Sequence, residues 1–226
     1  VRVGLPQPYG SNDGVAGRTT AVLVDVARLS SARAEGLRTG LADLTRALPP
    51  TDRLALIPLA GDTRPVDFTT THARVLDAAT ALTLRTSPTW SAKQDAEAVE
   101  STLGALGRAA VMLGAEPGVK TLILVTEPFA VSGRLRESIQ ALGELVARNR
   151  IALYIVLPHA TAVAAGNGIN ALAAGTGSMV LPLGSWSTVV AQEHARVELT
   201  LSNDEALDAG TMARALVTTT RPGLVA

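Results

Sequence analysis

Short runs of apolar residues alternate along most of the chain with longer stretches in which apolar residues recur every three or four positions. The short runs predict strands at residues 20–25, 53–59, 120–126, 151–157 and 179–183. The longer stretches predict helices over about 32–47, 70–82, 92–113, 134–149 and 169–174. Because the main strands are apolar on both faces, they belong in a sheet that is covered on both sides. This alternation predicts an α/β fold with a Rossmann-like, doubly wound, mostly parallel sheet.

Both ends of the chain depart from this alternation. Residues 1–19 are rich in proline and glycine, which predicts a linker or an extended arm. The domain itself is predicted over 20–184. The pattern changes in 185–226, where two alternating segments, 197–201 and 212–219, predict a β-hairpin at the sheet edge or the start of a further module.

The composition excludes several classes of function. Basic and acidic residues balance at 20 each, and this zero net charge argues against nucleic acid as a partner. No apolar stretch approaches membrane-spanning length, so no membrane span is predicted. The sequence has no cysteine, which excludes disulfides and thiolate zinc sites. Neither a Gly-x-Ser-x-Gly elbow nor a Gly-Lys-Ser/Thr phosphate loop occurs, which disfavours esterase-type hydrolases and nucleotide binding.

One acid marks a candidate ligand site. The apolar run Thr20-Ala-Val-Leu-Val24 ends in Asp25, and ligands of open α/β sheets bind at the carboxyl ends of the strands. No oxygen-bearing side chain follows until Ser30, so the hydroxyls that would help this acid to hold a cation are missing. The pattern indicates a binding scaffold whose metal site has been eroded.

Three stretches, taken in order, resemble a von Willebrand factor A (vWA) domain of the kind found in bacterial exported proteins. They are Val22-Leu-Val-Asp25, the region from Asp52 through Val66-Asp-Phe-Thr-Thr70 to Leu82, and the region from Lys120-Thr-Leu-Ile-Leu-Val-Thr126 to Gly177. The resemblance implies one antiparallel edge strand and a ligand site at the carboxyl ends of the strands. In the family this site holds Mg²⁺ or Mn²⁺ through an Asp-x-Ser-x-Ser loop, a Thr and a second Asp.

The chain departs from this metal-binding pattern. Asp25 matches the first acid, but Ala27 and Leu29 replace the two serines, and Glu127 replaces the later Asp. The second loop offers Thr86, Ser87 and Thr89, with no single match. We therefore predict no bound metal and no cofactor. If a shifted Mg²⁺ or Mn²⁺ site survives, its candidate ligands are Asp25, Ser30 and Glu127. Ser30 and Ser31 are more simply explained as helix caps.

A protein partner is the expected ligand. The predicted partner-binding residues lie in three loops at the carboxyl ends of the strands: Asp25, Arg28, Ser30, Ser31, Ser87, Trp90, Glu127 and Phe129. Aromatic and arginine side chains are frequent anchors of protein interfaces. The alternative is that Trp90 and Phe129 pack into the domain as local core.

The leading functional hypothesis is a non-enzymatic protein-interaction module with a degenerate metal site. A second hypothesis is a structural subunit of a cell-envelope or extracellular assembly, held by the hairpin and the amino-terminal arm. A third and weaker one is a hydrolase that uses Asp25 and Glu127 as acid and base. The resemblance alone implies an extracytoplasmic or secreted location, and the cytoplasm remains open.

Overall fold

A computed structural model of the protein describes residues 2–3, 17–60, 62–84, 90–130, 133–158, 167–195 and 201–202. By contacts the chain divides into a large unit, Gly14–Arg196, and a small unit formed by both ends of the chain, Val1–Asp13 with Val197–Ala226. No helix in the described ranges is long and apolar enough to cross a membrane.

A six-stranded sheet with strand order β4-β3-β2-β5-β6-β7 forms the centre of the large unit. Its strands are β2 (Thr19–Val24), β3 (Arg53–Pro58), β4 (Val66–Thr69), β5 (Lys120–Val125), β6 (Ile151–Leu157) and β7 (Met179–Pro182). Every neighbouring pair is parallel except β3 and β4, which are antiparallel. The predicted α/β fold, with its mostly parallel sheet and one antiparallel edge strand, is confirmed.

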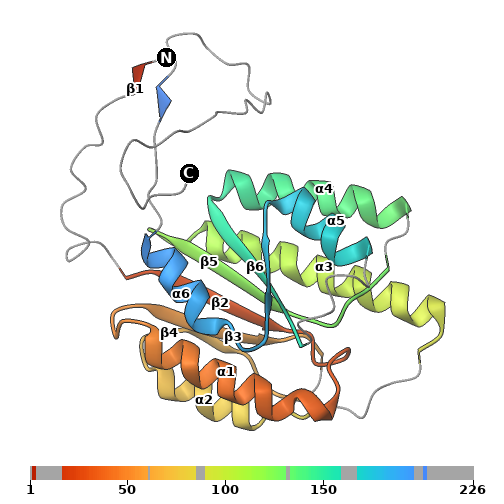
Figure 1. Ribbon diagram of the computed structural model, residues 1–226, viewed down its shortest axis with the longest axis horizontal. Helices are drawn as coiled ribbons and strands as arrows, with labels where there is room; N and C mark the ends of the chain where they lie inside the picture. Colours follow the sequence, from red (N-terminus) through yellow and green to blue (C-terminus); the bar gives the residue numbers. More distant parts are fainter. Residues whose placement is uncertain are drawn as a thin grey trace. The chain divides into compact units, whose positions relative to one another are not determined.

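Helices cover both faces of this sheet (Figure 1). On one face lie α3 (Ala92–Gly114), α4 (Gly133–Arg148) and α5 (Asn167–Thr176); on the other lie α1 (Ala34–Ala47), α2 (His72–Thr80) and α6 (Trp186–Ala195). The central strand β2 supplies both cores, because its successive side chains point to opposite faces. Ala21 and Leu23 join the core under α3 and α4, whereas Val22 and Val24 join the core under α1.

The carboxyl end of the large unit differs from the predicted boundary at residue 184. The segment that follows β7 is the helix α6, which packs against α1. Trp186 begins this helix and is only 1% exposed. It fits there because Gly40 on α1 has no side chain: a Cβ at that position would lie 1.7 Å from Trp186 Nε1. The helix α6 is therefore part of the domain and not of a β-hairpin, and its Trp186, Val189 and Val190 join the core under α1.

In the small unit, β1 (Arg2–Val3) pairs with β8 (Leu201–Ser202) in antiparallel orientation. A segment of the predicted arm thus pairs with a segment of the predicted extension. The rest of the predicted hairpin, including 212–219, lies outside the described residues.

Candidate functional site

Asp25 lies immediately beyond β2, at the carboxyl edge of the sheet, and is 2% exposed. Two hydroxyls donate to the same carboxylate oxygen, Oδ2: Thr102 Oγ1 at 2.9 Å and Thr126 Oγ1 at 3.0 Å. Burial raises the pKa of Asp25, while these two hydrogen bonds and the charge of Arg28 act in the opposite direction. A buried carboxylate in this place is held by hydroxyl donors and by one nearby positive charge.

That positive charge is Arg28, one tight turn later in the chain. Its side chain is 8% exposed, and its Nε lies 4.0 Å from Asp25 Oδ2. Its Nη1 donates to the carboxylate of Asp95, and its Nη2 donates to the carbonyl oxygen of Pro128 at 2.8 Å. The guanidinium thus joins groups from three separate segments of the chain.

Two aromatic rings complete the surroundings of this guanidinium. The centroids of Trp90 and Phe129 each lie 5.8 Å from Cζ of Arg28, within the range of cation–π attraction. Phe129 is buried at 4% exposure, and Trp90 is half-buried. Electron-rich ring faces therefore add to the two carboxylates and the carbonyl around Arg28.

The topology explains why these residues meet. β2 and β5 are parallel neighbours in register, so their carboxyl ends bring Asp25 and Thr126 to the same edge. The helix α3 begins at this edge, where a Ser91–Gln94 capping box fixes its first turn and places Asp95 beside the guanidinium. About two turns further along α3, on the same face of the helix, the hydroxyl of Thr102 donates to Asp25.

Of the residues predicted to bind a partner, the structure brings together Asp25, Arg28, Trp90 and Phe129. Ser30 is half-buried and Ser31 is exposed, and among the described residues neither side chain forms a hydrogen bond to Asp25. Ser30 stands at the N-cap of the 3₁₀ turn Ser31–Arg33, but its side chain makes no capping hydrogen bond. Glu127 is half-buried, and its backbone carbonyl, not its side chain, accepts from Thr126 Oγ1. Ser87 lies outside the described residues.

Sequence reasoning missed three residues of this site: Asp95, Thr102 and Thr126. A signal for Thr102 exists, because it is a hydroxyl on the apolar stripe of α3 between buried Val99 and Leu106. Thr126 directly follows β5, as Asp25 follows β2. Polar side chains at such places need a buried partner.

The groups around Asp25 suit a guanidinium better than a divalent metal ion. Ala27 brings no oxygen, and Leu29 is buried in the core beneath α1. Among the described residues, no group of three His, Cys, Asp or Glu side chains converges to hold a metal. A metal ion at Asp25 would also meet the positive charge of Arg28, whose Nε is 4.0 Å from Oδ2.

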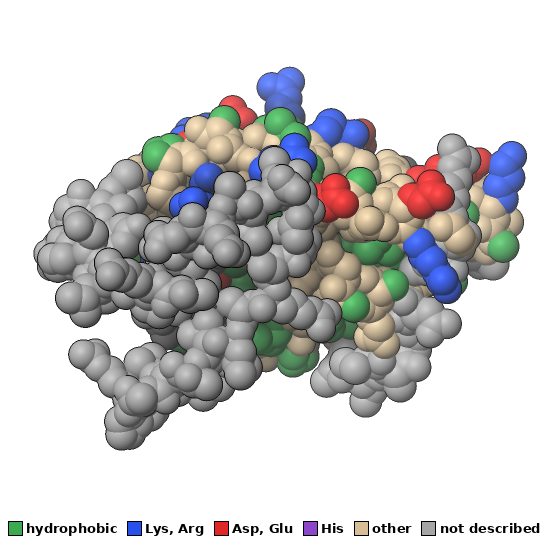
Figure 2. Space-filling view, turned by 90° about the horizontal axis from the view of Figure 1, so that it is seen from above, with side chains coloured by type: hydrophobic (Ala, Val, Ile, Leu, Met, Phe, Trp, Pro, Cys, Tyr) green, Lys and Arg blue, Asp and Glu red, His purple; other side chains and the backbone are tan. Residues whose placement is uncertain are grey.

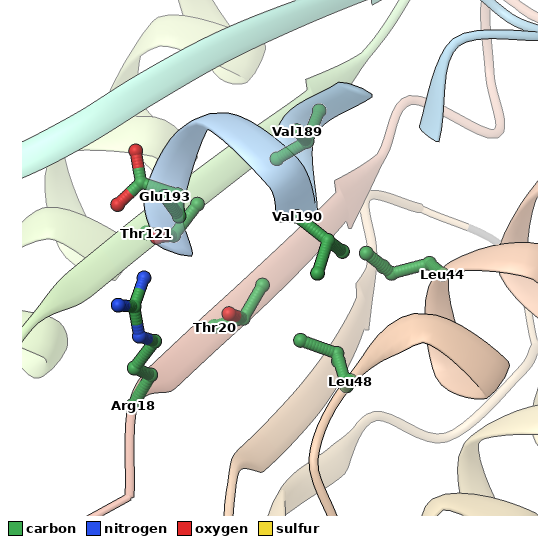
Figure 3. A pocket seen from close by; sticks show the side chains of 8 residues that line it. All are labelled: Arg18, Thr20, Leu44, Leu48, Thr121, Val189, Val190 and Glu193. Atoms are coloured by element: carbon green, nitrogen blue, oxygen red, sulfur yellow. The ribbon is translucent and has the colours of Figure 1, made fainter. Parts of the chain in front are cut away.

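A second buried polar cluster lies at the other end of the same strands. Figure 3 shows Arg18, Thr20, Thr121 and Glu193 around a small pocket that is closed on its other side by leucine and valine side chains. Glu193 is 5% exposed and accepts a 2.6 Å hydrogen bond from Tyr154 Oη. With a volume of about 10 Å³, the pocket has room for one water molecule at most. The pocket is therefore too small for a ligand larger than water.

The visible surface carries charges of both signs. Figure 2 shows one face of the molecule on which Lys and Arg side chains are interspersed with Asp and Glu among the described residues. Among the described residues on that face, no broad basic patch of the kind that nucleic acid requires is visible.

No family model and no curated protein matches the sequence. Solved structures, in contrast, match over most of the chain. The vWF domain of the type V pili tip protein Mfa5 from Porphyromonas gingivalis aligns with a TM-score of 0.56 at 10% identity, covering 82% of this chain and 99% of that domain. The SpRpn10 VWA domain aligns with a TM-score of 0.51 at 13% identity, covering 75% of this chain and 93% of that one.

Two larger proteins also contain a matching region. The human COPII-coat protein Sec24c aligns with a TM-score of 0.51 at 11% identity, over 80% of this chain but only 33% of its own. Proximal thread matrix protein 1 from the mussel byssus aligns with a TM-score of 0.53 at 14% identity, over 80% of this chain and 46% of its own. At these identities the similarity concerns the fold, and the chain has the fold of a von Willebrand factor A domain.

Proposed function

We propose that this protein is a non-enzymatic protein-interaction module that binds its partner through the loops at the carboxyl edge of the sheet, without a metal ion. The observation that carries this proposal is the internal pairing of the acid at that edge. Asp25 is already held by Arg28, Thr102 and Thr126. Because its charge is already balanced within the protein, this carboxylate does not require a metal ion. The residues around it would then contact the partner.

The contact residues are the accessible members of the predicted set. Ser31 is exposed, and Trp90, Ser30 and Glu127 are half-buried. Trp90 is the best candidate for an anchor, since a tryptophan ring offers a large apolar area at low entropic cost. Asp25 and Phe129 are buried, so their part is to hold Arg28, whose guanidinium lies beside Trp90. Ser87 remains a candidate.

Catalysis by Asp25 and Glu127 has little support. Asp25 is 2% exposed, and a general base must reach the proton it removes. Two threonine hydroxyls already lie within hydrogen-bond distance of its Oδ2, which leaves this oxygen less available to act as a base. We propose that the protein is not an enzyme.

A second function, as a subunit of a larger assembly, draws on one observation in the small unit. The pairing of β1 with β8 joins the two ends of the chain, so the segments expected to hold an assembly together form one unit. Similar folds occur in proteins whose names place them at a pilus tip, in a byssus thread and in a COPII coat. The pilus-tip protein supports an extracytoplasmic location, which we also propose.

Site-specific photocrosslinking tests which surface binds. A photoreactive amino acid is placed at Lys93, whose side chain is 86% exposed in the first turn of α3, or at Val111, 60% exposed near its end. At about 1.5 Å per residue, these positions lie roughly 27 Å apart along one helix, so Val111 is a matched control. The proposal predicts a protein adduct from position 93 in cells that make the protein.

The adduct should form equally when EDTA is added to permeabilised cells, and it should weaken when Trp90 is changed to Ala. Adducts from position 111 alone, or an adduct at position 93 that EDTA abolishes, would contradict the proposal. An adduct between copies of this chain would favour the assembly function instead.

A further inference from the structure

We propose that the guanidinium of Arg28 takes the place of a bound cation, so that the carboxyl edge of this vWA fold carries its own positive charge as a permanent part of the chain. This inference concerns the site alone. It does not rest on partner binding, and its test needs no partner.

The surroundings of Arg28 are those of a cation site. Oxygen ligands come from three segments: the Asp25 carboxylate after β2, the Asp95 carboxylate on α3, and the Pro128 carbonyl after β5. All three segments meet at the carboxyl edge of the sheet, where β2 and β5 end and α3 begins. The guanidinium joins them as an ion would, although its planar fork suits carboxylates and carbonyls in a fixed orientation.

The burial of this charge also requires such surroundings. An arginine side chain that is 8% exposed is rare in proteins unless its charge is compensated. Here two acids face one guanidinium, and the more exposed of them, Asp95 at 36%, keeps contact with solvent. The ring centroids of Trp90 and Phe129 each lie 5.8 Å from Cζ of Arg28. Rings in these positions favour a cation but supply no ligand for a metal.

One nitrogen of the guanidinium, Nε, lacks a hydrogen-bond partner among the described residues. Arg28 Nε is buried and makes no hydrogen bond within the described part of the chain, since its distance to Asp25 Oδ2 is 4.0 Å. Asp25 Oδ2 is instead occupied by the two threonine hydroxyls. The contact between Arg28 and Asp25 is therefore one of charge, whereas Asp95 and Pro128 fix the orientation of the guanidinium.

The test is chemical rescue of a variant that lacks the guanidinium. In Arg28→Ala, the acids Asp25 and Asp95 lose their cation and a space opens between them. We expect the melting temperature to fall by several degrees and to recover in part when millimolar methylguanidinium is added, relative to an equal concentration of sodium chloride. Wild-type protein should show no such rise.

The matched control is Arg46→Ala, because Arg46 also pairs with a carboxylate three positions away, Asp43, but is 74% exposed. Its removal should change the melting temperature little, and methylguanidinium should have no effect on it. A loss in Arg28→Ala that methylguanidinium does not reverse, or an unchanged melting temperature, would overturn the proposal.

Metal titration is an independent test that uses wild-type protein and so does not depend on the folding of a variant. Wild-type protein should show the same melting temperature in EDTA and in excess Mg²⁺ or Mn²⁺, because we expect neither ion to bind. An ion that bound only the folded state would raise the melting temperature. A rise with either ion in wild-type protein, lost in Asp25→Asn, would overturn the proposal.

If Arg28→Ala does not accumulate as folded protein, the double variant Arg28→Met with Asp25→Asn replaces it. This variant removes the charge together with its most buried counter-charge, so it should be more stable than Arg28→Met alone. A double variant that is less stable than Arg28→Met would show that Arg28 does not serve to balance Asp25.

Discussion

The hydroxyl of Thr102, in the middle of α3, donates a 2.9 Å hydrogen bond to the carboxylate of Asp25, which lies 77 residues earlier in the chain. Both groups are buried, at 3% and 2% exposure. A buried carboxylate without its donors is costly, and this bond ties the position of α3 to the carboxyl edge of the sheet.

We expect Thr102→Val, which keeps the shape of the side chain and removes the hydroxyl, to lower the free energy of unfolding by about 1–3 kcal/mol. Thr45→Val is the control, since Thr45 is also a buried helical threonine but donates only to a carbonyl of its own helix, that of Ala42. Urea unfolding of both variants measures the difference. An equal loss in the two would show that the bond to Asp25 has no special weight.

The pattern of apolar residues was sufficient to predict the sheet, because a strand buried on both faces has little freedom in its composition. β2, β5 and β6 are buried almost throughout, and their parallel direction follows from the alternation with helices. The rule that ligands lie at the carboxyl ends of such strands also placed Asp25 correctly at that edge.

The partners of Asp25 could not be predicted in the same way. Arg28 is three residues away, but its second acid, Asp95, is 67 residues from it and approaches only because α3 begins at this edge. The helix α6 was missed because Ser187, Thr188, Val189 and Val190 are residues with weak helix propensity. The helix α6 is stabilised by the burial of Trp186 against Gly40 of α1, and this contact joins two segments that are far apart in the sequence.

The pKa of Asp25 leads to a prediction on pH dependence. Burial raises this pKa above the ordinary value of 3.8, so the folded protein binds this proton more tightly than the unfolded chain. The contribution of Asp25 to stability is therefore complete below pH 3.8 and is lost as the pH rises through the raised value. Asp25→Asn does not titrate and does not suffer this loss.

Urea unfolding of wild-type protein and Asp25→Asn, followed across acidic to neutral pH, measures the effect. The free energy of unfolding of the wild type should fall relative to that of the variant as the pH increases, and the difference should level off once Asp25 is ionised. A difference that grows in favour of the wild type with rising pH would mean that Arg28 outweighs burial and holds the pKa down.

The start of α3 should depend on Ser91. This serine forms a capping box with Gln94, in which each side chain bonds to the backbone of the other residue. Ser91→Ala should lower the free energy of unfolding by about 1 kcal/mol. Ser30→Ala is the control, since Ser30 occupies an N-cap position without a side-chain bond and its loss should have almost no effect. Thermal unfolding of the two variants distinguishes them, and a larger effect at Ser30 would contradict the assignment of the caps.

The contact between α1 and α6 depends on the missing side chain of Gly40. A Cβ there would lie 1.7 Å from Trp186 Nε1, which is 1% exposed and has no room to withdraw. Alanine is a better helix former than glycine, so helix propensity alone would make Gly40→Ala stabilising by about 1 kcal/mol. The steric clash opposes this, because overpacking a core typically costs about 1–3 kcal/mol.

We therefore expect Gly40→Ala to destabilise the protein while Gly107→Ala stabilises it. Gly107 is also inside a helix, α3, but a Cβ there would meet nothing within 4 Å. The opposite signs separate the clash from helix propensity, and urea unfolding of both variants measures them. Trp186→Leu in the Gly40→Ala background should return part of the lost stability, since the smaller side chain makes room for the new methyl group. A stabilising Gly40→Ala would mean that α6 does not pack on α1 through this tryptophan.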